Sequence, residues 1–473
     1  MNTLGQAGQD ATSRDGRTFA FSAGAASPLG VGALVVLREP GGMAYLGQIL
    51  EQEADAASDL DRHRGQVITA LGEDGGPNRA ATRPFAAATV EAASPHLVEA
   101  LQATRGAELT VGTWESAGAR ARLRAQGFGR HTFLCGQSGS GKTYALGVIL
   151  EQLLLGTDLR MVVLDPNADY VRLAEPRPDA PEEEAERLRR LDAHILGSRD
   201  SGSAPLRMRF ATMPREAQAA VMRLDPLTDR EEYNHFVHFV EALAGAATAG
   251  GGEVEQVVAK MAEGGKVERA LSQRMENLGM VNWEVWAREQ QSAAEVVAAG
   301  ARLTVLDLSG FRTPQEPLAV SLDLIENLWS QRDTRTPTLI VIDEAHNICP
   351  AEPTSSIHVA LVERLTQIAA EGRKYGLWLL LSTQRPSKIH PQVLSQCDNL
   401  ALMRMNSPAD IAELGEVFGF APTAMLRASR YFTQGEALMA GIFVPVPGIV
   451  RMGARLTPEG GSDVSVPTGV ATA

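Results

Sequence analysis

An eight-residue motif, Gly136-Gln-Ser-Gly-Ser-Gly-Lys-Thr143, constrains the fold of this chain more than any other feature of its sequence. It follows the apolar run His131–Cys135 and opens a stretch with helical spacing, 143–155. A glycine-rich loop between a buried strand and a helix lets backbone N–H groups surround a phosphate. The alternative is a chance glycine-rich turn. The predicted phosphate-binding residues are Gly136, Ser138, Gly139, Ser140, Gly141, Lys142 and Thr143.

Two acidic residues follow a second apolar run, Thr338–Ile342, about 200 residues downstream of the motif. In α/β proteins that bind phosphate with a glycine-rich loop, the carboxyl end of such a strand lies at the phosphate-binding crevice. We therefore expect Asp343 and the Thr143 hydroxyl to hold Mg²⁺ on the triphosphate, while Lys142 reaches the β and γ phosphates. Glu344 is predicted to act as the general base that activates water. The alternative is a strand that ends in two solvated acids.

Polar residues also end two other apolar runs. Gln384 comes after Leu379-Leu-Leu-Ser-Thr383 and is predicted to sense the γ-phosphate beside the acidic strand. Asp165 ends the run Arg160–Leu164 and is predicted to face the same crevice, where it would orient water or metal. The alternatives are a strand-end cap for Gln384 and a turn-forming aspartate before proline for Asp165.

Two arginines are candidates for a catalytic cation that one copy lends to the nucleotide of another. Arg130 directly precedes the first core strand, and Arg373 ends the helix predicted over 357–375. An arginine supplied in this way raises turnover by about 10³–10⁵. The alternative for each is a solvated cation near a helix end.

The 473 residues divide into regions of different pattern. Short apolar segments broken by glycine predict a small barrel or sandwich, with charged stretches such as 51–65 between strands. Alternating strand and helix patterns predict a doubly wound parallel sheet. Residues 182–196 have helical spacing. Residues 206–210 have a strand-like pattern within this region, and their secondary structure is ambiguous. The predicted regions are a disordered tail (1–17), a β-barrel (18–115), the core (116–175 and 301–456), a mostly helical insertion (176–300) and a flexible tail (457–473).

Composition narrows the classes of protein further. The net charge of −13 argues against a surface coated with basic residues for nonspecific nucleic-acid binding. The chain has three widely spaced cysteines, which predicts neither a disulfide framework nor a zinc site. Its N-terminus is polar and it contains no apolar run of about 18 residues, so we expect a cytoplasmic protein without a membrane segment.

Together these segments resemble the HerA family of hexameric DNA-translocating ATPases. The similarity covers most of 128–175 and 300–450 and lies in GRHTFLCGQSGSGKT, VVLDPNADY, LIVIDEAHNICP and, most closely, EGRKYGLWLLLSTQRPSKIHPQVLSQCDNLALMRM. The second segment departs from the family, which usually has Gly-Glu-Tyr where this chain has Ala168-Asp169-Tyr170. We therefore assign no catalytic role to Asp169.

The resemblance implies an α/β fold: a RecA-like P-loop ATPase core with an N-terminal small β-barrel and a helical insertion. It also implies a homohexamer that binds ATP and Mg²⁺ between subunits and translocates double-stranded DNA. Family partners are nucleases or sirtuin-type NAD-consuming enzymes, in DNA repair or antiviral defence, and nothing in this chain selects among them. The predicted DNA-contacting residues are Lys260, Lys266, Arg269 and the loop Arg385–Lys388; the alternative is that they are solvated surface cations.

Two other functions remain open on the sequence alone. A nucleotide-gated hexameric scaffold would assemble or activate an effector enzyme without substantial DNA pumping. A conjugative or division DNA pump of the FtsK type is the third possibility, and the lack of a membrane segment argues against it.

Overall fold

The computed structural model describes residues 9–24, 27–54, 60–78, 80–246, 254–288 and 290–460. The chain forms two compact units, which we describe separately. The first unit combines Met1–Thr157, Thr383–Ser387 and Leu394–Ala454. The second combines Asp158–Ser382, Lys388–Val393 and Arg455–Ala473.

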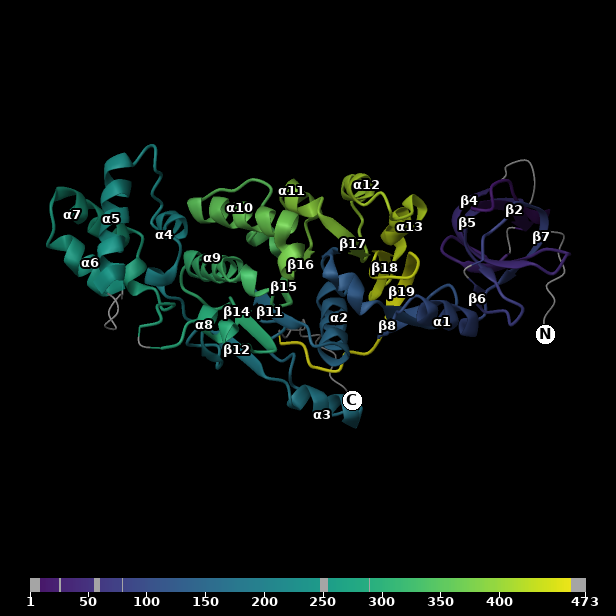
Figure 1. Ribbon diagram of the computed structural model, residues 1–473, viewed down its shortest axis with the longest axis horizontal. Helices are drawn as coiled ribbons and strands as arrows, with labels where there is room; N and C mark the ends of the chain where they lie inside the picture. Colours follow the sequence, from purple (N-terminus) through teal and green to yellow (C-terminus); the bar gives the residue numbers. More distant parts are fainter. Residues whose placement is uncertain are drawn as a thin grey trace, which may run out of the picture. The chain divides into compact units, whose positions relative to one another are not determined.

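A closed antiparallel β-barrel forms the N-terminal part of the first unit (Figure 1). Six strands follow one another around it in the order β2-β1-β7-β3-β4-β5, and pairing of β2 with β5 closes the ring. Side chains such as Phe19, Leu37 and Tyr45 fill its interior. The strands are β1 (Gln9–Ser13), β2 (Thr18–Gly24), β3 (Leu34–Arg38), β4 (Ala44–Ala54), β5 (Leu60–Leu71) and β7 (Phe85–Ala92), with the short β6 (Pro77–Asn78) beside β5. The predicted barrel is confirmed.

Two local expectations for this region were wrong. Residues 9–13 were placed in a disordered tail but form β1, which pairs with both β2 and β7; residues 1–8 lie outside the described part. The charged stretch 51–65 is not a separator, because β4 and β5 pair along it as far as Ala54 and Asp61. In β5 the exposed Arg62 and Arg64 alternate with the buried His63 and Gly65, as the strand period of two permits.

The remainder of the first unit is a sheet in the order β10-β17-β18-β19-β8-β9. β10 (His131–Cys135) runs parallel to β17 (Cys397–Leu402), and the other pairs are antiparallel. These are β18 (Glu436–Gly441), β19 (Gly448–Met452), β8 (Leu109–Trp114) and β9 (Arg120–Leu123). The sequence reading did not predict the hairpin of β18 and β19. The helices are α1 (Pro95–Thr104), α2 (Lys142–Gly156), α12 (Pro408–Val417) and α13 (Thr423–Ala428).

The second unit contains the parallel sheet that the strand–helix alternation predicted. Its order is β13-β12-β14-β11-β15-β16, and most strand residues are buried, as expected when helices cover both faces. Right-handed crossovers place α9 (Gln315–Ser330) and α10 (Ser356–Glu371) on the same face, where they pack together (Figure 1). The strands are β11 (Arg160–Asp165), β12 (Ala193–Gly197), β13 (Ala204–Pro205), β14 (Leu303–Asp307), β15 (Thr338–Ile342) and β16 (Leu377–Thr383).

The region predicted as a mostly helical insertion also supplies a strand to this sheet. The helix expected over 182–196 ends at Arg189, and 193–197 form β12, which pairs in parallel with β14. Backbone pairing with a buried strand therefore outweighs the helical spacing. Residues 206–210 form no named strand, although Met208 makes an isolated bridge to Trp286. The helices are α3 (Glu182–Arg189), α4 (Arg215–Val221), α5 (Arg230–Ala246), α6 (Val254–Ala262), α7 (Lys266–Asn277) and α8 (Ala293–Ala298).

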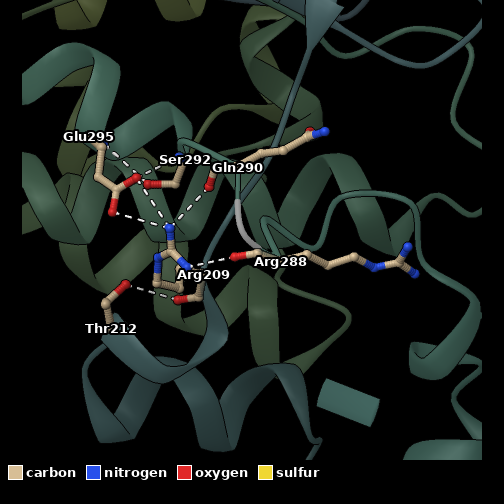
Figure 2. Close-up of polar contacts among 6 residues, drawn as sticks. All are labelled: Arg209, Thr212, Arg288, Gln290, Ser292 and Glu295. Carbon is tan, nitrogen blue, oxygen red and sulfur yellow. Dashed lines mark hydrogen bonds and ion pairs between the residues drawn. The ribbon is translucent and has the colours of Figure 1, made fainter. Parts of the chain in front are cut away.

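One arginine ties the segment before α4 to the loop before α8 (Figure 2). Arg209 donates hydrogen bonds to the carbonyl oxygens of Arg288 (2.9 Å) and Gln290 (3.0 Å). It also pairs with the carboxylate of Glu295 at 3.4 Å. Glu295 in turn forms a capping box with Ser292 at the start of α8. We refer to these five residues as the Arg209 clamp.

The three cysteines, Cys135, Cys349 and Cys397, are buried free thiols. Among the described residues, no helix combines the length and hydrophobicity needed to cross a lipid bilayer. The expected cytoplasmic location stays a prediction.

Candidate nucleotide-binding site

The backbone of the predicted phosphate loop requires its glycines. Gly139 and Gly141 have φ angles of +72° and +90°, a left-handed conformation that other residues adopt at a cost. At Gly136, an added Cβ would lie 2.7 Å from Cβ of Met403 and 2.8 Å from Oγ of Ser140, which is too close for a side chain. The motif therefore folds as a tight loop between β10 and α2.

Neighbouring segments hold this loop in place. The N–H of Gln137 donates to the carbonyl of Arg404 (3.0 Å), and the N–H of Gly435 donates to the carbonyl of Ser140 (3.0 Å). Arg404 also donates from Nη2 to the carbonyl of Gly139 (3.3 Å). The last two bonds use loop carbonyl groups, which turns these carbonyl groups away from a bound anion.

The start of α2 has the chemistry of an anion site. Its N-cap is Gly141, so no side chain caps the first turn. Ser140 is fully buried, and its Oγ has no hydrogen-bond partner among the described residues. Lys142 is 5% exposed at the first helical position and Thr143 is half-buried. N–H groups, a hydroxyl and an ammonium group at a helix N-terminus are complementary to phosphate.

Gln384 lies in the same unit as the phosphate loop, directly after a residue that contacts the loop. The carbonyl of Thr383, the residue before Gln384, accepts a hydrogen bond from the N–H of Gly136 at 3.4 Å. The Thr383 hydroxyl accepts from the N–H of Arg385 and so fixes the turn after the strand. Gln384 itself is exposed. This placement agrees with the expectation that a polar strand end adjoins the phosphate loop.

In the second unit, Asp165 ends β11 and is fully buried. Its Oδ1 accepts hydrogen bonds from the N–H groups of Asn167 and Asp169, and its Oδ2 accepts from that of Tyr170 at 2.7 Å. Burial raises the pKa of Asp165 to about 7, against the effect of these hydrogen bonds, and the negative charge of Asp343 adds to the rise. Asp165 thus caps the turn after its strand and adds a buried carboxyl group at the edge of the sheet.

Asp343 and Glu344 directly follow β15. Asp343 is 1% exposed, and its N–H donates to the carbonyl of Leu164 (3.1 Å), one residue before Asp165. Glu344 has a φ of +42°, an unusual conformation for a residue with a side chain, and non-glycine residues in this region cluster at functional sites. Its Oε2 lies 3.3 Å from Nδ1 of His346.

The donor set of the chain fits Mg²⁺ carried by a nucleotide better than a metal held by protein alone. Within the described ranges, no group of three or more His, Cys, Asp or Glu side chains is arranged to hold a metal ion. Mg²⁺ normally takes one or two protein ligands together with phosphate oxygens and water. Asp343, with a second buried carboxyl group nearby at Asp165, fits that requirement.

Both predicted arginines lie at the opposite end of their strands from these groups. Arg130 precedes β10, whose far end begins the phosphate loop, and it forms a 3.6 Å ion pair with Asp398. Arg373 is exposed and precedes β16, whose far end precedes Gln384. A strand of five to seven residues spans about 16–23 Å. Within its own unit, neither arginine reaches the strand ends that carry the other site residues.

The predicted DNA-contacting cations are exposed but dispersed. Lys260 lies in the last turn of α6, and Lys266 begins α7. Arg269 also lies on α7, where its Nη1 donates to the carbonyl of Gly264 (3.1 Å). Lys388 follows the strand end that carries Gln384. The structure assigns none of them a ligand, so their role stays a prediction.

Sequence reasoning missed four features of these strand ends. Asp307 ends β14 and lies directly opposite Asp165 in register, and its Oδ1 accepts from both the N–H and the hydroxyl of Ser309. Arg404 follows β17 and contacts the phosphate loop. His346 contacts Glu344, and the segment Ser429–Gly435 contacts the loop through Gly435. A systematic search of residues after each predicted strand would have found Asp307 and Arg404.

Two family models match the chain. The model described as "Helicase HerA, central domain" matches residues 109–327, which include the phosphate loop. The model of the ATPase family associated with various cellular activities matches residues 292–405, which include the acidic strand end. The resemblance to the HerA family that was recognised from sequence is therefore confirmed.

Curated proteins similar to this chain include several HerA helicases. The HerA DNA double-strand break repair helicase of Pyrococcus furiosus is 23% identical over 68% of this chain and 65% of its own length. The HerA helicase of Sulfolobus acidocaldarius is 22% identical over 73% of this chain and 69% of its own length. A probable HerA helicase of Methanocaldococcus jannaschii is 30% identical, but the match spans only 31% of this chain and 28% of the relative.

Solved structures agree on the fold. VirB4 of Thermoanaerobacter pseudethanolicus superposes with a TM-score of 0.51 at 15% identity and covers 74% of this chain and 97% of VirB4. The bacterial conjugative coupling protein TrwBdeltaN70 superposes with a TM-score of 0.50 at 13% identity, covering 78% and 94% of the two chains. The predicted P-loop ATPase fold is thus confirmed.

Proposed function

We propose that this chain hydrolyses ATP as a subunit of a homohexameric ring and uses the energy to move double-stranded DNA. The observation that carries this proposal is the phosphate loop at the start of α2, with Lys142 and an uncapped helix N-terminus. The match to the HerA family model supports the choice of DNA as substrate. Curated proteins similar to this chain include helicases named for DNA double-strand break repair.

The residues divide the chemistry between them. The loop N–H groups and Lys142 bind the β and γ phosphates. Thr143 and Asp343 would hold Mg²⁺, which would neutralise charge on the phosphates. Glu344 accepts a proton from the attacking water. Gln384 contacts the γ-phosphate or that water, and Asp165 holds the turn beside Asp343.

Arg373 and Arg130 act on the nucleotide of a neighbouring copy. Their location before β16 and β10, at the ends of these strands opposite to the site, supports this division. Each projects toward solvent or a weak ion pair rather than into the chain's own interior. An arginine in such a place completes a site only when another copy packs against it, which makes hydrolysis depend on assembly.

Two variants test the enzymatic part of the proposal. Lys142→Ala is expected to lose ATP binding and turnover, with Lys260→Ala, an exposed lysine on α6, as the matched control. Arg373→Ala is expected to keep ATP binding by isolated subunits and to lose turnover. Mixing Lys142→Ala with Arg373→Ala subunits then restores part of the activity if the arginine acts between copies. Wild-type activity in Lys142→Ala would overturn the proposal.

The scaffold function is the second candidate. The net charge of −13 supports it, because an acidic chain is less suited to nonspecific nucleic-acid binding. In that case nucleotide binding assembles a nuclease or a sirtuin-type NAD-consuming effector in DNA repair or antiviral defence, and DNA pumping is unimportant. ATP turnover by the intact assembly, measured with and without double-stranded DNA at several salt concentrations, separates the two. Salt-sensitive stimulation by DNA supports the motor; turnover that ignores DNA supports the scaffold.

A further inference from the structure

The segment Ser429–Gly435 lies against the phosphate loop in the first unit. Gly435 donates its N–H to the carbonyl of Ser140, and its own carbonyl accepts from the N–H of Met452 in β19. The side chain of Gln434 lies beside Gly141, with its Cγ 3.6 Å from the place where a Cβ on that glycine would stand. At the other end of the segment, the carbonyl of Ser429 accepts from the N–H of Met405, just after β17.

Tyr431 stands out within this segment. It is 82% exposed, the largest exposed fraction among the large hydrophobic side chains of the described residues. The next residue, Phe432, is 5% exposed, so the segment is anchored by one aromatic ring and presents the other to solvent.

We propose that Tyr431 and Gln434 form the subsite for the base and sugar of the bound nucleotide, with the Tyr431 ring stacking on the base. This inference rests on the proposed function, because it assumes that the phosphates occupy the loop. The segment touches the loop at Ser140 and Gly141, where the loop passes into α2. A nucleotide held there by its phosphates extends its sugar and base beyond the loop.

Chain geometry sets the reach of this subsite. Tyr431 is four residues from Gly435, so its backbone lies at most about 14 Å from the contact with the loop. This limit is comparable to the distance that a nucleoside adds to a triphosphate, so the Tyr431 side chain is within reach of a bound base. Gln434, nearer the loop and exposed, carries an amide that donates and accepts hydrogen bonds and suits a sugar hydroxyl. Stacking needs only a π-face, so the ring tolerates different bases and serves affinity more than specificity.

The test uses the full chain and two competing ligands. The probe is fluorescent 1,N6-ethenoadenosine triphosphate, displaced either by ATP or by inorganic tripolyphosphate, which has no base. Tyr431→Ala is expected to weaken ATP about 5- to 100-fold and to leave the affinity for tripolyphosphate unchanged. Tyr431→Phe keeps the ring and is expected to bind like the wild type. Leu227→Ala removes another highly exposed apolar side chain, in the other unit, and serves as the control.

Three results would overturn the subsite. The first is an unchanged ATP affinity in Tyr431→Ala, and the second is an equal loss of affinity for ATP and tripolyphosphate. The third is a normal ATP affinity with reduced self-association, which would instead assign Tyr431 to a contact between copies. Failure of the proposed function appears differently: the wild type would bind neither ATP nor tripolyphosphate, or Lys142→Ala would bind both as tightly as the wild type.

Discussion

Asp165 and Asp323 are both almost fully buried in the second unit, but the charges around them differ. Burial raises the pKa of each carboxyl group to about 7. The strongest charges acting on Asp165 are those of Asp343 and Asp169, which are also negative. Asp323 lies on α9, where Glu295 raises its pKa further and the Arg209 guanidinium lowers it.

The difference shows which buried charge is balanced by the fold itself. At the Arg209 clamp, Arg209 pairs with the carboxylate of Glu295 (Figure 2), and its positive charge also lowers the pKa of Asp323 within the unit. At the strand ends, carboxyl groups crowd together and Asp165 receives hydrogen bonds from backbone N–H groups alone. Such a site gains most from a cation supplied from outside, as Mg²⁺ bound to a triphosphate would be.

The largest expected effect tests the strand-end side of this comparison. Glu344→Gln keeps the size and shape of the side chain but removes the base, so turnover is expected to fall by about 10²–10⁴ while ATP binding persists. Steady-state hydrolysis and equilibrium binding measure the two quantities separately. Glu352→Gln, at an exposed glutamate on the following loop, is the control. If Glu344→Gln turned over ATP at the wild-type rate, the base would have to be another group.

A smaller effect tests the clamp side. The pKa of Asp323 is near 4 when the chain is unfolded and about 7 when it is folded, so between these values the folded chain holds the extra proton. Stability is therefore expected to fall as pH rises from about 4 to about 7, by up to roughly 4 kcal/mol. Asp323→Asn imitates the protonated acid and is expected to be modestly more stable than the wild type at pH 5, where part of the loss has already occurred, and to exceed it by more at pH 8.

Urea or thermal unfolding at pH 5 and pH 8 measures this contribution, with Asp333→Asn at an exposed acid as the control. Parallel pH profiles for the wild type and Asp323→Asn would contradict it. They would mean that Arg209 offsets the buried charge completely, and the contrast with the strand ends would then be sharper than described.

The smallest expected effect lies in the turn after β11. Ala168 has a φ of +60°, where an alanine costs about 1–2 kcal/mol and a glycine is unstrained. Because glycine also loses more entropy on folding, Ala168→Gly is expected to stabilise the chain by up to about 1 kcal/mol. Ala174→Gly, in the same loop without a positive φ, is expected to destabilise it instead. Denaturant titration of both variants provides the measurement, and equal shifts would show that the turn is not strained.

Much of the fold followed from local pattern because its elements are self-contained. The run from His131 to Thr143 specifies strand, loop and helix in sequence, and β14, β15 and β16 are short, almost wholly apolar segments. By contrast, β12 carries the weak pattern Ala193–Gly197 after a helical stretch, and only its pairing with β14 makes it a strand. The same holds for β1, whose polar residues become ordered between β2 and β7.

The candidate site shows the same division. Lys142, Asp343 and Glu344 were predicted because each is defined by its immediate neighbours in the chain. Arg404 and Tyr431 were not, since neither belongs to a motif and each gains its position from hydrogen bonds between distant segments.

The sequence by itself determined the chemistry of this protein: a phosphate loop whose glycines are required by its backbone angles, and acids placed directly after buried strands. These follow from steric and polar preferences that act over a few residues. Only the tertiary structure decided that β12 joins the sheet, that the barrel closes through β2 and β5, and that Ser429–Gly435 lies on the phosphate loop. Such contacts are chosen because they satisfy buried backbone groups across long separations, and no local pattern encodes that choice.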